Sequence, residues 1–190
     1  MLIISQNASN YGIPLPSNAI YRINLAWINN IQEFEELLKK HKNHKIFLDL
    51  PINRVKPPNN KYSLDDISQI LKSYNNIKYF AISNVKTSND LDEYLSLLPI
   101  TVTLIPKIEN IIGIKNIEKI TEKLPYQEKI IMLDHDDLFS SIIKSKKPVS
   151  IFTNYISKLV VFCKKNKITL LRTVGVVFSD DEFRTTQYIR

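Results

Sequence analysis

The chain has 190 residues, of which 44% are hydrophobic and 24% charged, a composition typical of a globular protein. The net charge of +7 can indicate a nucleic-acid-binding protein. Here the lysines are spread over most of the chain and no nucleic-acid recognition motif accompanies them, so we expect no nucleic-acid partner. No apolar run approaches the ~20 residues of a membrane helix and no signal peptide is recognised, so we expect no membrane partner. The single Cys163 excludes an internal disulfide and favours a cytoplasmic location.

Short apolar strands alternate with helical stretches along the chain. The periodicity predicts strands at Leu2–Ser5, Ala19–Trp27, Lys45–Pro51, Lys78–Ser83, Thr101–Ile108, Lys129–Asp134 and Ile168–Val174. It predicts helices at Ile31–Lys42, Asp65–Tyr74, Ser88–Leu98, Ile114–Lys123, Asp136–Lys144 and Asn154–Lys165, with one more capped helix opening at Ser179.

This alternation predicts an α/β fold with a parallel sheet in a single domain covering residues 1–190. A regular TIM-type barrel has eight strands and typically ~250 residues, and we count only about seven strands. The fold we expect is therefore a TIM-type (β/α) barrel that is truncated or incomplete.

Polar side chains follow five or six successive strands at the point where each strand ends. In parallel α/β sheets, ligands bind outside the carboxyl ends of the strands, where such groups from separate strands converge. The residues concerned are Arg22, Asn24, Asp49, Ser83, Lys86, Lys107, Glu109, Asp134, His135, Asp136, Asp137, Arg172 and Thr173.

Two carboxylates in this set, Glu109 and Asp137, come from adjacent strands and are suited to hold a divalent cation. Magnesium is usually bound by one or two carboxylates, with water and substrate oxygens as the other ligands. Lys107 would neutralise charge developing beside that metal, and Arg22 and Lys56 would neutralise an anionic group such as phosphate. The alternative is a set of surface ion pairs, each contributing about 0–1 kcal/mol.

Two motifs resemble the catalytic barrel of pyruvate kinase. They are PKIEN (Pro106–Asn110) and, one strand later, IIMLDHDDL (Ile130–Leu138). YRINLAW, IFLDLPINRVK, YFAISNVKTSNDLDEY and LVVFCKKNKITLLRTV are similar to further segments of that family, in the same order, so the resemblance covers most of the chain.

The resemblance implies roles for individual residues. Glu109 and Asp137 would bind Mg²⁺ or Mn²⁺, and Lys107 would stabilise an enolate beside the transferred phosphoryl group. Arg22 would contact phosphate, and Thr173 would lie near the pyruvate carbon. Asn24 and Asp49 match residues of the family's K⁺ site. Lys56 replaces an arginine, and Asp136 replaces a glycine that binds the substrate carboxylate.

Departures from the family pattern qualify these implications. The nucleotide-closing lid is missing, which argues against ADP as acceptor. Ala26 and Leu50 replace K⁺ ligands, so we expect the K⁺ site to be lost. The last barrel strand is missing as well, so we expect a homo-oligomer or a partner that completes the barrel.

The leading hypothesis is a divalent-metal enzyme acting on phosphoenolpyruvate, pyruvate or a related 2-oxo acid through a metal-stabilised enolate, with phosphoryl transfer to an acceptor other than ADP. A second is a lyase or aldolase of the citrate-lyase type. A third is a non-catalytic interaction protein. Among the other side chains, we expect His41 and His44 to be solvated and Cys163 to be buried and inert.

Overall fold

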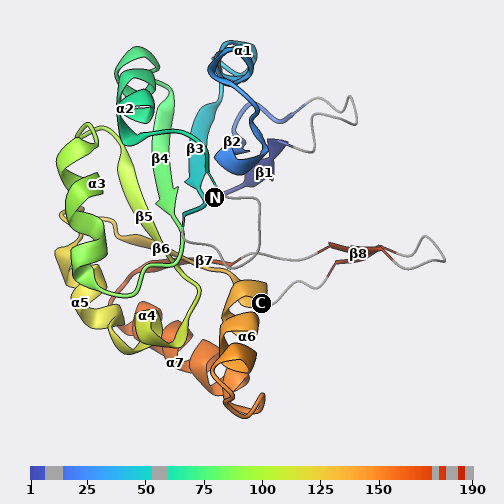
Figure 1. Cartoon of the computed structure of the whole chain (residues 1–190), viewed down its shortest axis with the longest axis vertical. Helices are drawn as coiled ribbons and strands as arrows, with labels where there is room; N and C mark the ends of the chain where they lie inside the picture. The colour runs from blue at the N-terminus through green and yellow to red at the C-terminus, as the bar shows by residue number, and fades with distance from the viewer. Residues whose placement is uncertain (7–14, 53–59, 173–175, 179–183, 187–190) are drawn as a thin grey trace.

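The computed structural model describes residues 1–6, 15–52, 60–172, 176–178 and 184–186. Its main feature is one curled sheet of seven parallel strands, which forms a half-barrel (Figure 1). The strands lie in sequence order, so each strand pairs with the ones before and after it in the chain. They are β1 (Ile3–Ser5), β2 (Ile20–Asn24), β3 (Lys45–Leu50), β4 (Ile77–Ile82), β5 (Thr103–Ile108), β6 (Ile130–Leu133) and β7 (Thr169–Arg172).

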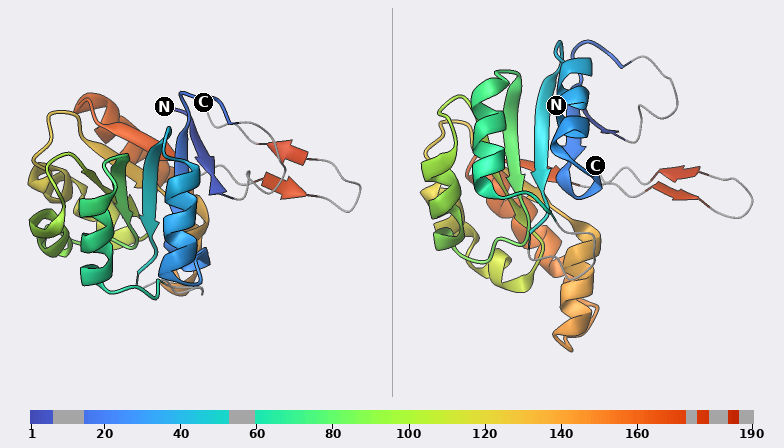
Figure 2. Two further views of the ribbon diagram at one scale, coloured as in Figure 1. Left: turned by 90° about the horizontal axis from the view of Figure 1, so that it is seen from above. Right: turned by 45° about the horizontal axis from the view of Figure 1, so that its top comes forward.

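The helices lie on the convex side of this sheet (Figure 2). A short antiparallel pair, β8 (Val176–Phe178) and β9 (Arg184–Thr186), follows the last strand of the sheet. None of the described helices is long and apolar enough to cross a bilayer. The helices are α1 (Ile31–Lys40), α2 (Leu64–Ser73), α3 (Asp92–Leu97), α4 (Ile111–Lys115), α5 (Ile117–Lys123), α6 (His135–Lys144) and α7 (Ile151–Lys165), with 3-10 turns η2 (Leu25–Trp27) and η3 (Ser88–Leu91).

The side chains of each strand alternate between two buried layers, because successive residues of a strand point to opposite faces of the sheet. In β3, Ile46, Leu48 and Leu50 belong to the large core between sheet and helices. Phe47 belongs to a smaller cluster on the other, concave face. This smaller cluster comprises Ile20, Phe47, Ala81, Ile105, Ile130 and Met132.

Side-chain caps determine where several helices begin. Asn30 accepts a hydrogen bond from the Glu33 N–H at 2.8 Å, and Ser63 forms a capping box with Asp66. Asp134 caps α6 by accepting from the backbone N–H groups of Asp136 and Asp137. Each of these asparagine, serine or aspartate residues comes directly before the helix that it caps.

All seven strands of the sheet lie where the sequence pattern predicted strands, and some boundaries and end segments differ. The strand expected at Ala19–Trp27 gives way to η2 after Asn24, because the Asn24 side chain accepts from the Ala26 N–H and turns the chain. The helix expected after Ser179 is wrong for Arg184–Thr186, which pair with β8 as a strand. Ser88–Leu98 is divided into η3 and α3, and the helix expected at Ile114–Lys123 begins earlier, as α4 followed by α5.

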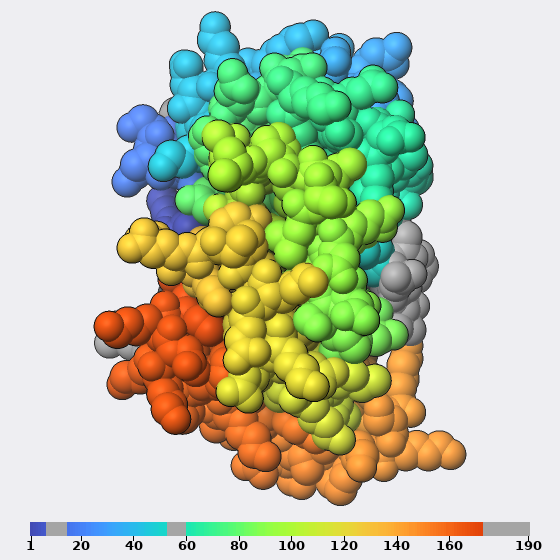
Figure 3. Space-filling view, turned by 90° about the vertical axis from the view of Figure 1, so that its left-hand side faces the viewer, coloured from blue at the N-terminus to red at the C-terminus, as the bar shows by residue number. Residues whose placement is uncertain are grey.

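Two helices, α6 and α7, form one end of the molecule beyond the sheet. The turn between them lies at the tip of this end (Figures 1 and 2). In the space-filling view, the side chains of α6 and α7 make up the lower surface of the molecule, below α3 and α5 (Figure 3).

The His41 side chain is buried against β2, and its predicted solvation is therefore wrong. Its ring stacks on Tyr21 with a centroid distance of 3.6 Å, and only 6% of the residue is exposed. The ring centroid of His44 lies 5.6 Å away. Burial, followed by the nearby charges of His44 and Lys40, lowers the pKa of His41 from 6.5 to about 4.

Gly113 in α4 allows this helix to approach the loop after β4 closely. A Cβ atom at this position would lie 2.4 Å from the carbonyl oxygen of Val85. Since that neighbour is backbone, a larger residue would have to push the helix and the loop apart.

The free energy of unfolding should fall as the pH is lowered from about 6.5 to about 4, because the unfolded chain then binds a proton that folded His41 excludes. Urea unfolding across this pH range measures the effect. His41→Phe keeps the stack on Tyr21 and cannot titrate, so its unfolding midpoint should vary less with pH. An equal pH dependence in both proteins would contradict the assignment.

Gly113→Ala should lower the free energy of unfolding by about 1–3 kcal/mol, although alanine is normally the better helix former. The reason is the clash with the Val85 carbonyl. Chemical denaturation measures the change, with Lys115→Ala on an exposed position of the same helix as the control. A stabilised Gly113→Ala protein would show that the close approach does not exist.

Candidate functional site

Lys107 lies on the concave face of β5, two residues after the buried Ile105. Its ammonium is 2.9 Å from Oε1 of Glu109 and 3.4 Å from Oδ1 of Asp49, and it donates a hydrogen bond to the Ser83 hydroxyl at 3.1 Å. Only 3% of the residue is exposed. Lys107 therefore joins side chains from three neighbouring strands in one buried cluster.

Asp49 carries the second half of this cluster. It lies on β3 next to Lys107 and is fully buried. Its Oδ2 pairs with the Arg22 guanidinium of β2, while Oδ1 faces Lys107. Burial alone would raise the pKa of Asp49, but Lys107 and Arg22 hold it below its ordinary value.

Glu109 follows β5 and is held from two sides. Its Oε1 faces Lys107, and its Oε2 accepts a hydrogen bond from the backbone N–H of Asn84 at 2.8 Å. Asn84 has a φ of 58°, a left-handed conformation that asparagine tolerates better than most residues. The Asn110 amide donates to the Asn84 side chain at 2.8 Å and its oxygen caps α4, so it ties this turn to the end of β5.

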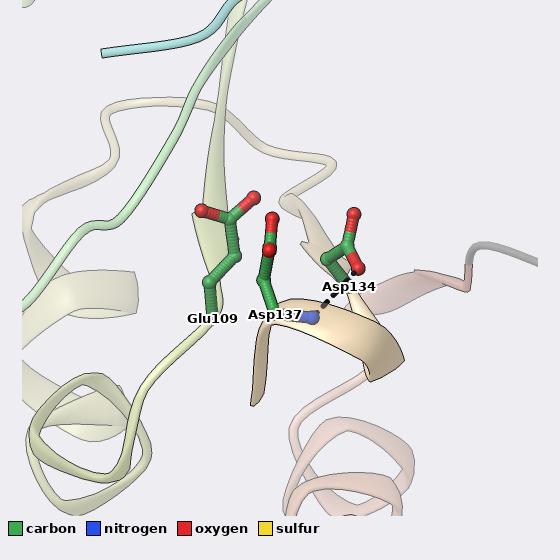
Figure 4. A group of neighbouring side chains, drawn as sticks. All are labelled: Glu109, Asp134 and Asp137. Atoms are coloured by element: carbon green, nitrogen blue, oxygen red, sulfur yellow. Dashed lines mark hydrogen bonds between the residues drawn. The ribbon is translucent and has the colours of Figure 1, made fainter. Parts of the chain in front are cut away.

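Three carboxylates converge beside this cluster. Glu109, Asp134 and Asp137 each offer an oxygen atom, and these atoms lie within 4.8 Å of one another. In Figure 4 the three side chains stand next to each other, Glu109 after β5 and the two aspartates at the start of α6. The structure thus brings together the two metal ligands expected from the sequence.

Asp134 is the member that the sequence analysis did not assign as a ligand. It caps α6, since Oδ1 accepts from the N–H groups of Asp136 and Asp137 at 3.2 Å. Because a cap needs only one oxygen, the other remains for a ligand. The sequence signal was an aspartate directly after β6, three residues before Asp137.

The described part of the site is rich in carboxylates. Asp49, Glu109, Asp134 and Asp137 lie near two cationic side chains, Arg22 and Lys107. Burial raises the pKa of Glu109, Lys107 lowers it, and the charges of Asp134 and Asp137 raise it further, with a net increase. A divalent cation bound to Glu109, Asp134 and Asp137 would reduce the repulsion among these carboxylates.

A pocket of about 250 Å³ lies next to the cluster, at the end of β4. Ser83 and Asn84 line it, and these residues contact Lys107 and Glu109. A larger pocket of about 340 Å³ is lined by Lys129 and Ile168, at the amino ends of β6 and β7, away from the carboxylates. We therefore consider the smaller pocket the more relevant to the site.

The other predicted site residues are more dispersed. Asn24 uses its side-chain oxygen to accept from the Ala26 N–H, and its own N–H donates to Gln6 Oε1 at 2.6 Å. Asp136 is exposed next to the carboxylate group and is not a member of it. Lys56 and Thr173 lie outside the described residues.

Comparisons with known proteins show the fold alone. No protein-family model matches the chain. No curated protein matches it either. Among solved structures, RipC from Yersinia pestis is 16% identical, with a TM-score of 0.59 over 85% of this chain and 72% of RipC. RipC is one of 199 matching chains, so the fold is widespread and does not by itself select a function.

The resemblance to pyruvate kinase is therefore wrong. Neither a family model nor a curated protein supports it, and the similar structure is that of RipC. The motifs that suggested it, PKIEN and IIMLDHDDL, are short strands followed by polar groups. Strands that end in polar groups occur in many parallel α/β proteins, because ligands bind at that edge of the sheet, so these motifs do not identify one family.

Replacing Lys107 should cost stability, because Asp49 and Glu109 would remain buried without their shared cation. Removal of one partner from a buried ion pair typically costs about 3–5 kcal/mol, and we expect a loss of this size in Lys107→Met. Urea denaturation measures it, with the exposed Lys119→Met as the control. A loss below about 1 kcal/mol, the range of surface pairs, would contradict a buried cluster.

Proposed function

We propose that this protein is a divalent-metal-dependent enzyme that acts on a 2-oxo acid, such as pyruvate, through an enolate. The observation that carries this proposal is the group of three carboxylates, Glu109, Asp134 and Asp137, beside the buried Lys107. It lies at the carboxyl end of a parallel sheet, where α/β enzymes bind their ligands.

The donor atoms fit magnesium or manganese. All three are carboxylate oxygens, which hard divalent cations prefer, and the group contains no sulfur or imidazole ligand. Magnesium usually retains water molecules and binds through few carboxylates. A magnesium ion bound on one side by three carboxylates would keep coordination positions for substrate oxygens on the other side.

The fixed charges of the site suit an anionic substrate only when a cation is present. A bound Mg²⁺ would act as a Lewis acid on the carboxylate and keto oxygens of a 2-oxo acid and stabilise the negative charge of the enolate. Lys107 holds the Glu109 carboxylate in place from the buried side. Arg22 pairs with Asp49 and its side chain is 22% exposed, so an anionic substrate would reach only part of the guanidinium.

The same geometry favours carbon–carbon bond cleavage or formation over phosphoryl transfer. Phosphoryl transfer needs cationic groups directed at the phosphate. Here Lys107 is buried between Asp49 and Glu109, and the Arg22 guanidinium pairs with Asp49. A lyase or aldolase reaction depends mainly on the metal and on contacts that hold the 2-oxo acid. This reaction class is therefore better supported than phosphoryl transfer.

The finer fold assignment is also part of this proposal. We infer that the half-barrel is a TIM-type barrel that lacks closure within the described residues, because consecutive strands are neighbours and the helices lie outside. The strands at its edges are β1 and β7, each paired on one side only in the described part of the chain. A second copy or a partner chain would be needed to cover them.

Calorimetric titration of Mn²⁺ tests the metal site. We expect binding in the wild type that strengthens with pyruvate and weakens about tenfold or more in Asp137→Asn and Asp134→Asn, because each loses a charged ligand. Asp136→Asn is the matched control, since Asp136 is adjacent, exposed and outside the group. Equal weakening in all three variants, or no binding in the folded wild type, would exclude the site.

Hydrogen exchange at the pyruvate methyl group tests the enolate step. In D₂O with Mg²⁺, the wild type should accelerate deuterium incorporation, as measured by proton NMR, because an enolate exchanges that hydrogen. Asp137→Asn should lose the acceleration and Asp136→Asn should keep it. If Mn²⁺ binds tightly but no 2-oxo acid tested exchanges, the enolate chemistry is wrong and only the metal site remains.

A further inference from the structure

The positive charge of this protein is concentrated in one part of the chain. Between Leu138 and Ser179 there are seven lysines and one arginine but no aspartate or glutamate. The chain as a whole carries +7, so the residues outside this stretch sum to −1. Lysines are spread along the sequence, but the acids that would balance them are absent here.

In the structure this acid-free stretch includes most of α6, all of α7, and β7, and the two helices lie at the end of the molecule beyond the sheet (Figure 1). All seven lysines are exposed, and none of them makes an ion pair within the described part of the chain. They are Lys144, Lys146, Lys147, Lys158, Lys164, Lys165 and Lys167.

The turn between α6 and α7 also exposes apolar side chains among these lysines. Ile143 is 53% exposed and Val149 is 51% exposed, one on each side of Lys144, Lys146 and Lys147. We call these five residues the basic tip. It lies at the outer end of α6, where the chain turns back toward α7 (Figures 1 and 2).

We propose that the basic tip docks on an anionic lipid surface. In this arrangement Ile143 and Val149 enter the boundary between headgroups and acyl chains, while the three lysines contact lipid phosphates. Exposed apolar side chains flanked by lysines are the combination that binds at such an interface, by apolar burial together with attraction to anionic lipids. Because the contact is peripheral, it needs no membrane-spanning helix.

A nucleic acid fits this surface less well. Its phosphates and bases are preferentially read by the planar fork of arginine and by exposed aromatic rings. The cationic side chains of the tip are all lysines, and the aromatic side chain of α6, Phe139, is 37% exposed and packs edge-on against Phe152 at a centroid distance of 5.3 Å. Exposed Ile143 and Val149 would gain nothing from a phosphate backbone.

The docking surface is separate from the carboxylate site. The cap of α6 is Asp134 and its last residue is Lys144. A helix rises 1.5 Å per residue, so about 15 Å separate the two ends. Lipid binding should therefore be unaffected by Asp137→Asn, and it does not depend on the proposed enzymatic function.

Cosedimentation of the full chain with lipid vesicles tests the proposal. We expect binding to phosphatidylcholine vesicles that contain about one third phosphatidylserine, no binding to pure phosphatidylcholine, and weakening with added salt. Lys144→Glu/Lys146→Glu/Lys147→Glu should bind about 100-fold more weakly, because each lysine near an anionic surface contributes about fivefold. Ile143→Asn/Val149→Asn should also bind measurably more weakly.

The matched control is Lys42→Glu/Lys45→Glu/Lys72→Glu, which changes the net charge equally at exposed positions elsewhere. It should bind within about threefold of the wild type. No binding of the wild type to anionic vesicles, or an equal loss in this control, would overturn the proposal. Unchanged binding of Ile143→Asn/Val149→Asn would overturn the insertion. If the wild type binds duplex DNA more tightly than anionic vesicles, and the triple lysine variant loses this binding, the partner of the basic tip is a nucleic acid and not a lipid surface.

Discussion

The buried contact of the Lys107 ammonium with Asp49 and Glu109 is the interaction on which the rest of the site depends. A buried charge is costly unless it is paired, and here Lys107 pairs both with Asp49 of β3 and with Glu109, which directly follows its own strand β5. This is possible because the alternation of side chains directs Asp49 and Lys107 to the same concave face on which Phe47 and Ile105 are packed. The polar cluster is thus a continuation of the apolar one along the same strands.

Glu109 connects the stable part of the site with the part that can bind a ligand. One of its oxygens faces Lys107, and the other accepts from the Asn84 backbone. A cation shared with Asp134 and Asp137 would therefore have to compete with Lys107 for Glu109, or use a lone pair that the present contacts leave. The proximity of three carboxylates favours that competition, because a divalent cation can be shared by all three whereas Lys107 contacts Glu109 alone among them.

The sequence predicted the parts of this arrangement that follow from strand periodicity and the direction of the chain. Glu109 and Asp137 follow neighbouring parallel strands, so their convergence needed no knowledge of the helices. Asp134 was named among the strand-end residues but not as a ligand, because the sequence does not show that its side chain lies beside Glu109 and Asp137. The burial of His41 was missed because its lysine-rich neighbours suggested solvent, whereas its ring packs on Tyr21 of the preceding strand, β2. Contacts between residues of different elements, such as His41 and Tyr21, leave no pattern in the neighbouring sequence from which they could be predicted.

Some of the charged residues of α6 and α7 stabilise the helix dipole, and others do not. Asp134, Asp136 and Asp137 at its start and Lys144 at its end are the charges that stabilise a helix dipole. Lys146 and Lys147 lie beyond its last turn, and Lys158 lies in the middle of α7, where the dipole has little effect. Local helix stability therefore explains the acids beside the carboxylate site and Lys144, but not Lys146 and Lys147 of the basic tip. Seven exposed lysines without an acid among them repel each other, and an anionic surface would relieve that repulsion.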